Sequence, residues 1–214
     1  MSTDFEQIKA KIDYLLSRDD IAFPPNVYWD WKTEGLREPL SDERLTPRER
    51  LLAVCDDLRM GQLWFYGADR RRKRLVDESE TEWSGEHDWI IIGESALAET
   101  TAILLHAQTG EVAFYDADAW DWNLRDNFVF VKESLAAFVD EVALGLDYEL
   151  LYYQNLEELA EVLGFEDDEF PGIEADPWYH LLREMRADLF GDAAVPRDRR
   201  QELLRRLEAA EDEE

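Results

Sequence analysis

Carboxylates and indoles alternate in one short stretch of the chain, Asp-Ala-Asp-Ala-Trp-Asp-Trp-Asn at residues 116–123. Oxygen ligands at such short spacing suit calcium, but an EF-hand loop needs a central glycine and a glutamate at its twelfth position. Alanine and tryptophan stand here where small or polar residues would be needed. We therefore expect no metal to be bound by the three aspartates, Asp116, Asp118 and Asp121.

The same stretch is the best candidate for contact with a protein partner. Tryptophan offers a large, rigid contact area, and a carboxylate beside it can pair with Arg or Lys of a basic protein. The stretch joins two predicted strands, so it should lie at the rim of a sheet. The alternative is that both indoles fold back over the core, because exposed indoles lower solubility. The predicted partner-binding residues are Asp116, Asp118, Trp120, Asp121 and Trp122.

Signatures of catalysis are missing elsewhere in the chain. The histidines are few and scattered, with no paired spacing typical of a zinc-binding helix. Gly93-Glu94-Ser95 resembles the start of a nucleophile elbow, but Leu97 replaces the second glycine that the close turn requires. The chain contains no phosphate-binding glycine loop. We expect neither an enzyme nor a cofactor; the alternative is a hydrolase that uses Asp116 and Asp121 as an acidic pair.

Four apolar runs and a helix surround this stretch and must position it. The runs, bounded by turn residues, have the length and composition of strands. After Ser134 the apolar spacing changes to three and four residues, which predicts a helix to Leu144. The predicted strands are Trp89–Ile92, Ala102–Leu105, Val112–Tyr115 and Phe128–Val131.

This order of elements, from about Asp19 to Gly145, resembles the SUKH superfamily, which includes bacterial immunity proteins against polymorphic toxins and fungal cell-wall-assembly regulators. The resemblance lies in a strand that ends in a Gly-Glu turn, a second strand, a Thr-Gly turn, a third strand and a helix that begins at a serine. An early Pro-rich segment and a later glycine also match. The matching residues are Ile92-Gly93-Glu94, Leu104-Leu105, Thr109-Gly110-Glu111-Val112, Ser134 to Phe138, Phe23 to Tyr28, and Gly35-Leu36.

The resemblance implies an α+β domain with a largely antiparallel sheet flanked by helices and no transferable catalytic residues. It also implies a function in protein binding. We expect an immunity protein that neutralises a basic toxin, such as a nuclease, by covering its active face. A regulatory or scaffold protein of the same fold is the alternative.

Flanking segments predict further helices. A capping-box pattern at Thr3 and Glu6 predicts one helix to about Arg18, and Thr46-Pro47 begins a second that should reach Arg59. Gln62 to Tyr66 reads as a strand. Beyond Gly145 the pattern is helical, with starts near Asn155, Asp176 and Pro196 and an acidic tail that should fray. We expect a SUKH-like domain over residues 1–146 and a C-terminal helical extension over residues 147–214.

The charge of the chain limits its partners. With 51 acidic and 23 basic residues, the net charge is −28. Such a surface repels nucleic acid and anionic membranes and attracts a basic protein, although solubility or salt adaptation would give the same composition. The basic run Arg70 to Arg74 is followed by acidic residues that should neutralise it. A single cysteine and the absence of an apolar leader predict a cytoplasmic location, and the oligomeric state is left open.

Overall fold

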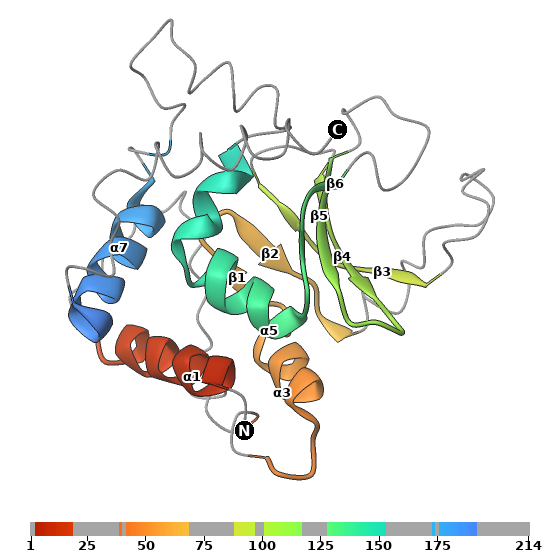
Figure 1. Ribbon diagram of the computed structural model, residues 1–214, viewed down its shortest axis with the longest axis horizontal. Coiled ribbons are helices and arrows are strands. Elements are labelled where there is room, and N and C mark those ends of the chain that lie inside the picture. Colours follow the sequence, from red (N-terminus) through yellow and green to blue (C-terminus); the bar gives the residue numbers. More distant parts are fainter. Residues whose placement is uncertain are drawn as a thin grey trace, which may run out of the picture.

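The computed structural model describes residues 3–18, 39, 42–68, 88–96, 101–116, 128–152, 173 and 176–191. These residues form an α+β fold: a six-stranded antiparallel sheet with helices grouped beside it (Figure 1). The predicted fold class is confirmed, including a C-terminal helix that packs against the first helix of the chain. The proposed division at residue 146 stays a prediction.

The sheet is a simple meander, because every strand pairs with its neighbours in chain order. Its strands are β1 (Arg59–Met60), β2 (Leu63–Phe65), β3 (Trp89–Ser95), β4 (Thr101–His106), β5 (Val112–Asp116) and β6 (Phe128–Lys132). Antiparallel pairing places the start of β2, the end of β3, the start of β4 and the end of β5 at one end of the sheet, which we call the rim end. The β4–β5 turn lies at the opposite, hairpin end.

The helices follow start signals that the sequence carries. They are α1 (Thr3–Leu16), α3 (Pro47–Val54), α5 (Leu135–Ala137), the π-helical turn η3 (Phe138–Ala143), the 3-10 helix η4 (Leu146–Tyr152) and α7 (Pro177–Phe190). Thr46 and Glu49 form a reciprocal capping box at α3, because each side chain accepts a hydrogen bond from the backbone of the other. Ser134 caps α5 and Asp176 caps α7.

One predicted helix boundary is wrong, and one predicted helix has the expected bounds but an unexpected form. The helix that begins after Thr46 was expected to reach Arg59, but α3 ends at Val54. The chain turns there because Asp57 adopts a positive φ of 56°, and Leu58 and Met60 are then buried on the way into β1. The helix from Ser134 to Leu144 exists, but its second half is a π-helical turn, in which the Leu144 amide donates to the Val139 carbonyl at 2.8 Å.

The main core lies between the helices and one face of the sheet. It joins apolar residues of α1, α5, η3 and α7 to the inward residues of the strands. One ion pair is included: Lys11 of α1 lies 2.6 Å from the Asp140 carboxylate of η3 and is 3% exposed. Burial lowers the pKa of the Lys11 ammonium, and the Asp140 charge opposes that shift. A buried pair of this kind fixes how α1 meets η3.

Several predictions concern residues outside the described part of the chain. These are the Pro-rich and aromatic segment that begins at Phe23, the basic run at Arg70, the expected helices that begin near Asn155 and Pro196, and the acidic tail. Within the described residues, no helix has the length and apolar composition that a bilayer-crossing segment requires.

Candidate binding surface at the rim end of the sheet

The sequence-predicted binding stretch begins at the rim end. Asp116 is the last residue of β5 and pairs across the sheet with Thr101. Thr101 in turn exchanges hydrogen bonds with the backbone of Ser95, so three strand ends are joined here. Asp116 is 1% exposed, whereas a residue in contact with a partner was expected at the surface. The other four predicted contacts, Asp118, Trp120, Asp121 and Trp122, lie outside the described residues, so the assignment of the stretch stays a prediction.

A row of three side chains crosses the neighbouring strands β1, β2 and β3. Arg59 pairs with Trp64, and Trp64 pairs with Glu94, so all three share one face of the sheet. The Arg59 guanidinium lies over the Trp64 ring, 4.5 Å from its centroid. All three residues are half-buried. A cation, an indole and a carboxylate are thus held side by side on strands.

The row borders a small depression, which we call the Trp64 hollow. Its volume is about 170 Å³, and it is lined by Arg59, Gly61, Gln62, Leu63, Trp64, Glu94 and Ala96. Sites for drug-sized ligands measure about 300–1,000 Å³. The hollow is therefore large enough for the end of one side chain and too small for a nucleotide or a flavin.

Two hydrogen bonds hold the walls of the hollow in place. The Tyr66 hydroxyl donates to the Glu94 carboxylate, and the Trp64 indole N–H donates to Asp57 Oδ1 at 3.4 Å. The Tyr66 ring also meets the Trp64 ring edge to face, with centroids 5.6 Å apart. The carboxylate and the indole are therefore preorganised before any partner arrives.

The turn at the base of the hollow rests on the C-terminal helices. Gly61 adopts a φ of +60°, and a Cβ atom there would lie 2.5 Å from the Tyr148 hydroxyl and 2.6 Å from the Trp178 ring. The Gln62 amide donates to the same hydroxyl at 2.8 Å. Only glycine meets both conditions, because it tolerates the left-handed conformation and has no side chain to displace.

One buried carboxylate completes this support. Asp176, the N-cap of α7, accepts hydrogen bonds from the Trp178 amide and the Tyr148 hydroxyl, both at 2.8 Å, and from the Tyr152 hydroxyl. Burial first and the Asp176 carboxylate second raise the pKa of both phenols above the ordinary value of about 10. Both phenols therefore stay protonated as donors at neutral pH. The β1–β2 turn is linked in this way to η4 and α7.

Other polar side chains also hold the fold together. Glu149, 1% exposed, accepts a hydrogen bond from the Tyr179 hydroxyl at 3.1 Å. Asp147 lies 2.6 Å from the Lys132 ammonium. His106, in β4, accepts a hydrogen bond from the Thr109 amide through Nδ1. Within the described ranges, no group of three or more histidine, cysteine or carboxylate side chains could hold a metal ion.

Sequence reasoning missed the Trp64 hollow, although one signal for it was present. Leu63 and Phe65 are fully buried, so the alternation of a strand places Trp64 on the opposite face. The sequence pattern does not place Arg59 in the row, because it predicts a helix that reaches Arg59. The short strand β1 brings it to the row.

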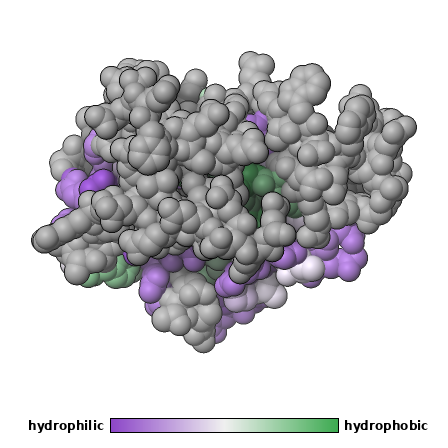
Figure 2. Space-filling view, turned by 45° about the horizontal axis from the view of Figure 1, so that its top comes forward, coloured by the Kyte–Doolittle hydropathy of each residue, from purple (hydrophilic) through white to green (hydrophobic). Residues whose placement is uncertain are grey.

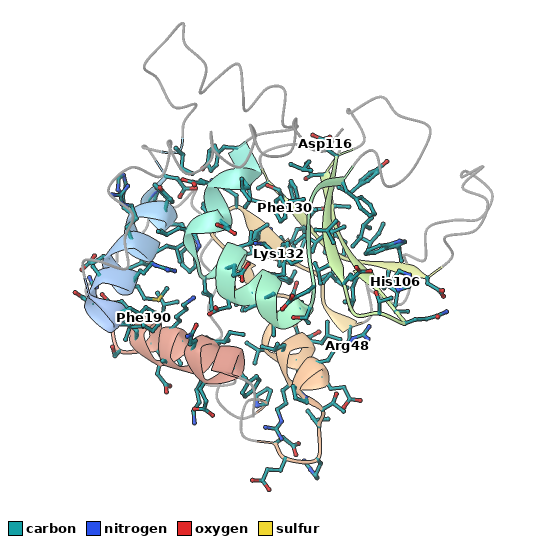
Figure 3. The ribbon with its side chains drawn as sticks, viewed as in Figure 1. Arg48, His106, Asp116, Phe130, Lys132 and Phe190 are labelled. Carbon is teal, nitrogen blue, oxygen red and sulfur yellow. The ribbon has the colours of Figure 1, made fainter. Side chains whose placement is uncertain are left out.

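The hollow and Asp116, the first residue of the predicted binding stretch, both lie at the rim end. Leu63 on β2 pairs with Ser95, and Thr101 pairs with Asp116 on β5. Neighbouring strands lie about 4.8 Å apart, so three spacings separate β2 from β5 by on the order of 15 Å. Figure 3 shows Asp116 at this end of the sheet and His106 and Arg48 toward the other.

The view in Figure 2 brings the top of Figure 1 forward. Described residues along its lower margin are mainly hydrophilic, and a hydrophobic area shows between grey atoms near the centre.

No family model, no curated protein and no solved structure matches the chain. Any function must therefore be argued from the residues themselves.

Proposed function

We propose that this protein is a non-catalytic binding module that captures a basic protein, in the manner of a SUKH-type immunity protein that neutralises a basic toxin such as a nuclease. The features that carry the proposal are a net charge of −28, an aromatic hollow at the rim end, and an acidic, tryptophan-containing stretch of the sequence whose first residue, Asp116, ends β5 there. Aromatic residues and arginine are enriched at the centre of protein interfaces, and polar groups surround them at the rim.

The use of the buried carboxylates supports binding over catalysis. Asp140, Glu149 and Asp176 each accept a hydrogen bond from a side chain on another element. These contacts join helices to one another, and none of the three carboxylates lines the hollow. The hydrolase alternative would rest on Asp116 and Asp121, and a regulatory or scaffold protein of the same fold would use the same surface for a partner that is not a toxin.

The net charge makes a kinetic prediction about the partner. An acidic protein draws a basic one from a distance, which raises the association rate constant more than the affinity of the final contact. Salt near 0.1 M shortens the reach of this field to about 10 Å. Association should therefore slow steeply with added salt, and dissociation should change far less.

Capture from lysate of the native host, followed by identification of the bound protein, supplies the partner for this test. Surface plasmon resonance at several salt concentrations then measures both rate constants. Trp120→Ala and Trp122→Ala should each speed dissociation and cost about 2 kcal/mol or more where the indole is a hot spot. Glu133→Gln, an exposed position beyond β6, is the control that removes one charge away from the rim end.

The outcomes separate the three functions. An association rate that is indifferent to salt, or a partner that is not basic, rejects electrostatic capture. A basic partner without toxic activity favours the regulatory alternative. Turnover of any substrate that is abolished by Asp116→Asn or Asp121→Asn would make the protein a hydrolase.

A further inference from the structure

We propose that the Trp64 hollow is the receptor for one arginine side chain of the basic partner, with Glu94 as the anion and Trp64 as the flat wall. This inference rests on the proposed function, because it names which group of the partner enters the rim end. One arginine of the partner is thereby assigned to a specific pocket, whereas the proposed function depends mainly on overall charge.

The Glu94 carboxylate can accept a further hydrogen bond. Glu94 is half-buried and lines the hollow, and Tyr66 supplies the one hydrogen bond that it accepts within the described part of the chain. That bond goes to Oε2, so Oε1 is open to a further donor. A hydrogen bond between a guanidinium and a carboxylate is about twice as strong as one between neutral groups.

Charges of both signs surround the hollow. Arg59 contributes one positive charge, and it lies against the Trp64 ring. Against it stand Glu94 in the hollow and Asp57, which accepts the indole hydrogen bond. Asp56 is the next residue, and its carboxylate accepts a hydrogen bond from the Ala68 amide. Among the described residues at the row, the negative charges of Glu94 and Asp57 exceed the one positive charge of Arg59, which favours a cationic guest.

The shape of the hollow favours arginine over lysine. A guanidinium is planar and weakly hydrated, so it can lie along an indole or beside another guanidinium, whereas a lysine ammonium is compact and strongly hydrated. The hollow has the Trp64 ring and the Arg59 guanidinium that lies over it as neighbouring walls, and its volume of about 170 Å³ admits the end of a single side chain. Arginine should therefore bind more tightly than lysine.

The support under the hollow explains why it is ready to receive a guest. Tyr66 holds the carboxylate, and Tyr148 holds the Gln62 amide at the base of the hollow. Groups that are already ordered lose little conformational entropy on binding. The hollow acts as a rigid receptor on strands, in contrast to a contact made by a long loop.

A titration of the full-length protein with N-acetyl-arginine amide, followed by NMR of the Trp64 indole N–H, tests this inference without the partner. Trp64→Phe assigns the signal. We expect a saturable shift with the arginine probe, a weaker one with N-acetyl-lysine amide, and binding at least about tenfold weaker with the neutral isostere N-acetyl-citrulline amide.

Two variants make the result specific. Glu94→Gln keeps the shape of the side chain and an acceptor for Tyr66, and it should weaken arginine binding by about tenfold or more. Glu133→Gln removes an equal charge elsewhere and should leave that affinity unchanged. Backbone spectra that match the parent protein show that both variants are folded.

Three results would overturn the inference: no saturable shift up to the solubility limit of the arginine probe, equal binding of citrulline and arginine, or equal effects of the two variants. Failure here leaves the proposed function standing if capture of a basic partner still depends on salt. Arginine binding without such a partner would show that the hollow is an arginine site, and it would reject both the proposed function and the assignment of the hollow to a basic partner.

Discussion

The two ends of the sheet are stabilised in different ways. At the hairpin end, polar contacts join residues that are neighbours in the chain: the Thr109 amide donates to His106 Nδ1, and the Gly110 amide donates to the His106 carbonyl. At the rim end, the contact that holds the β1–β2 turn joins Gln62 to Tyr148, which is 86 residues away. The β4–β5 turn is closed by contacts within the turn, whereas the β1–β2 turn depends on a distant helix.

This difference matters because the candidate binding surface lies at the dependent end. The Trp64 hollow keeps its shape only while η4 and α7 remain docked against the β1–β2 turn. At the hairpin end, longer contacts add to the local ones: the Gln108 side chain donates to the Asp88 carboxylate at 2.5 Å, and the Arg48 guanidinium donates to the Ala107 carbonyl at 3.0 Å. A hydrogen bond at such an exposed site contributes little to stability. A substitution that weakens the docking of α7 should therefore disturb the Trp64 hollow more than it disturbs the β4–β5 hairpin.

The largest expected effect comes from Gly61→Ala, with Gly110→Ala as its matched control. Both glycines have a positive φ, but an added Cβ at Gly110 meets nothing within 4 Å, whereas at Gly61 it meets Tyr148 and Trp178. Conformational strain alone costs about 1–2 kcal/mol. The steric conflict at Gly61 should add about 1–3 kcal/mol.

Urea unfolding of both variants measures this difference through the midpoint at constant m-value. Equal losses of unfolding free energy would show that Gly61 is needed only for its backbone conformation. The β1–β2 turn would then depend on contacts with distant helices no more than the β4–β5 turn does.

A smaller effect is expected from Asp176→Ala, for which Thr46→Ala is the matched helix-cap control. Loss of either cap costs about 1 kcal/mol. Asp176→Ala also removes the acceptor for the buried Tyr148 and Tyr152 hydroxyls, so the total should reach about 2–4 kcal/mol.

Thermal unfolding compares these two variants, and the NMR signal of the Trp64 indole reports on the hollow. Asp176→Ala should move that signal and Thr46→Ala should not. If both variants lose the same stability and leave the signal in place, Asp176 stabilises only the start of α7. Its hydrogen bonds to Tyr148 and Tyr152 would then not determine the shape of the hollow.

The smallest effect concerns alkaline pH and the contact between η4 and α7. Burial first, with the Glu149 charge second, raises the pKa of Tyr179 from an ordinary value near 10 to about 12. Between these two values the folded protein keeps a proton that the unfolded chain has lost. The contribution of Tyr179 to stability is therefore fully present below pH 10 and disappears as the pH rises toward 12.

Tyr179→Phe should make the free energy of unfolding less dependent on pH in that interval, as measured by urea unfolding at a series of pH values. Tyr148 and Tyr152 add to the same trend in the parent protein, because their pKa values are also raised. A slope unchanged by Tyr179→Phe would mean that the phenol ionises freely in the folded state.

The elements whose signals are local were predictable from the sequence. Thr46 and Ser134 begin helices because their side chains accept hydrogen bonds from amides three residues later. The strands from Trp89 to Val131 follow from apolar runs bounded by turn residues, and Gly110 permits the tight turn between two of them. The position of Asp116 at a sheet rim follows from the same order.

Distant contacts set the features that the sequence did not reveal. The end of α3 at Val54 depends on the burial of Leu58 and Met60 against other elements, which no local pattern expresses. The row of Arg59, Trp64 and Glu94 exists because three strands pair in one register.

By itself, the sequence determined the fold class, the capped helix starts and an acidic chain with a candidate binding stretch, because periodicity, capping and charge are properties of neighbouring residues. Only the tertiary structure decided that Tyr148, Asp176 and Trp178 support the turn beneath the Trp64 hollow. These residues meet the turn through packing between segments far apart in the chain. Such packing depends on how whole elements bury their apolar faces together.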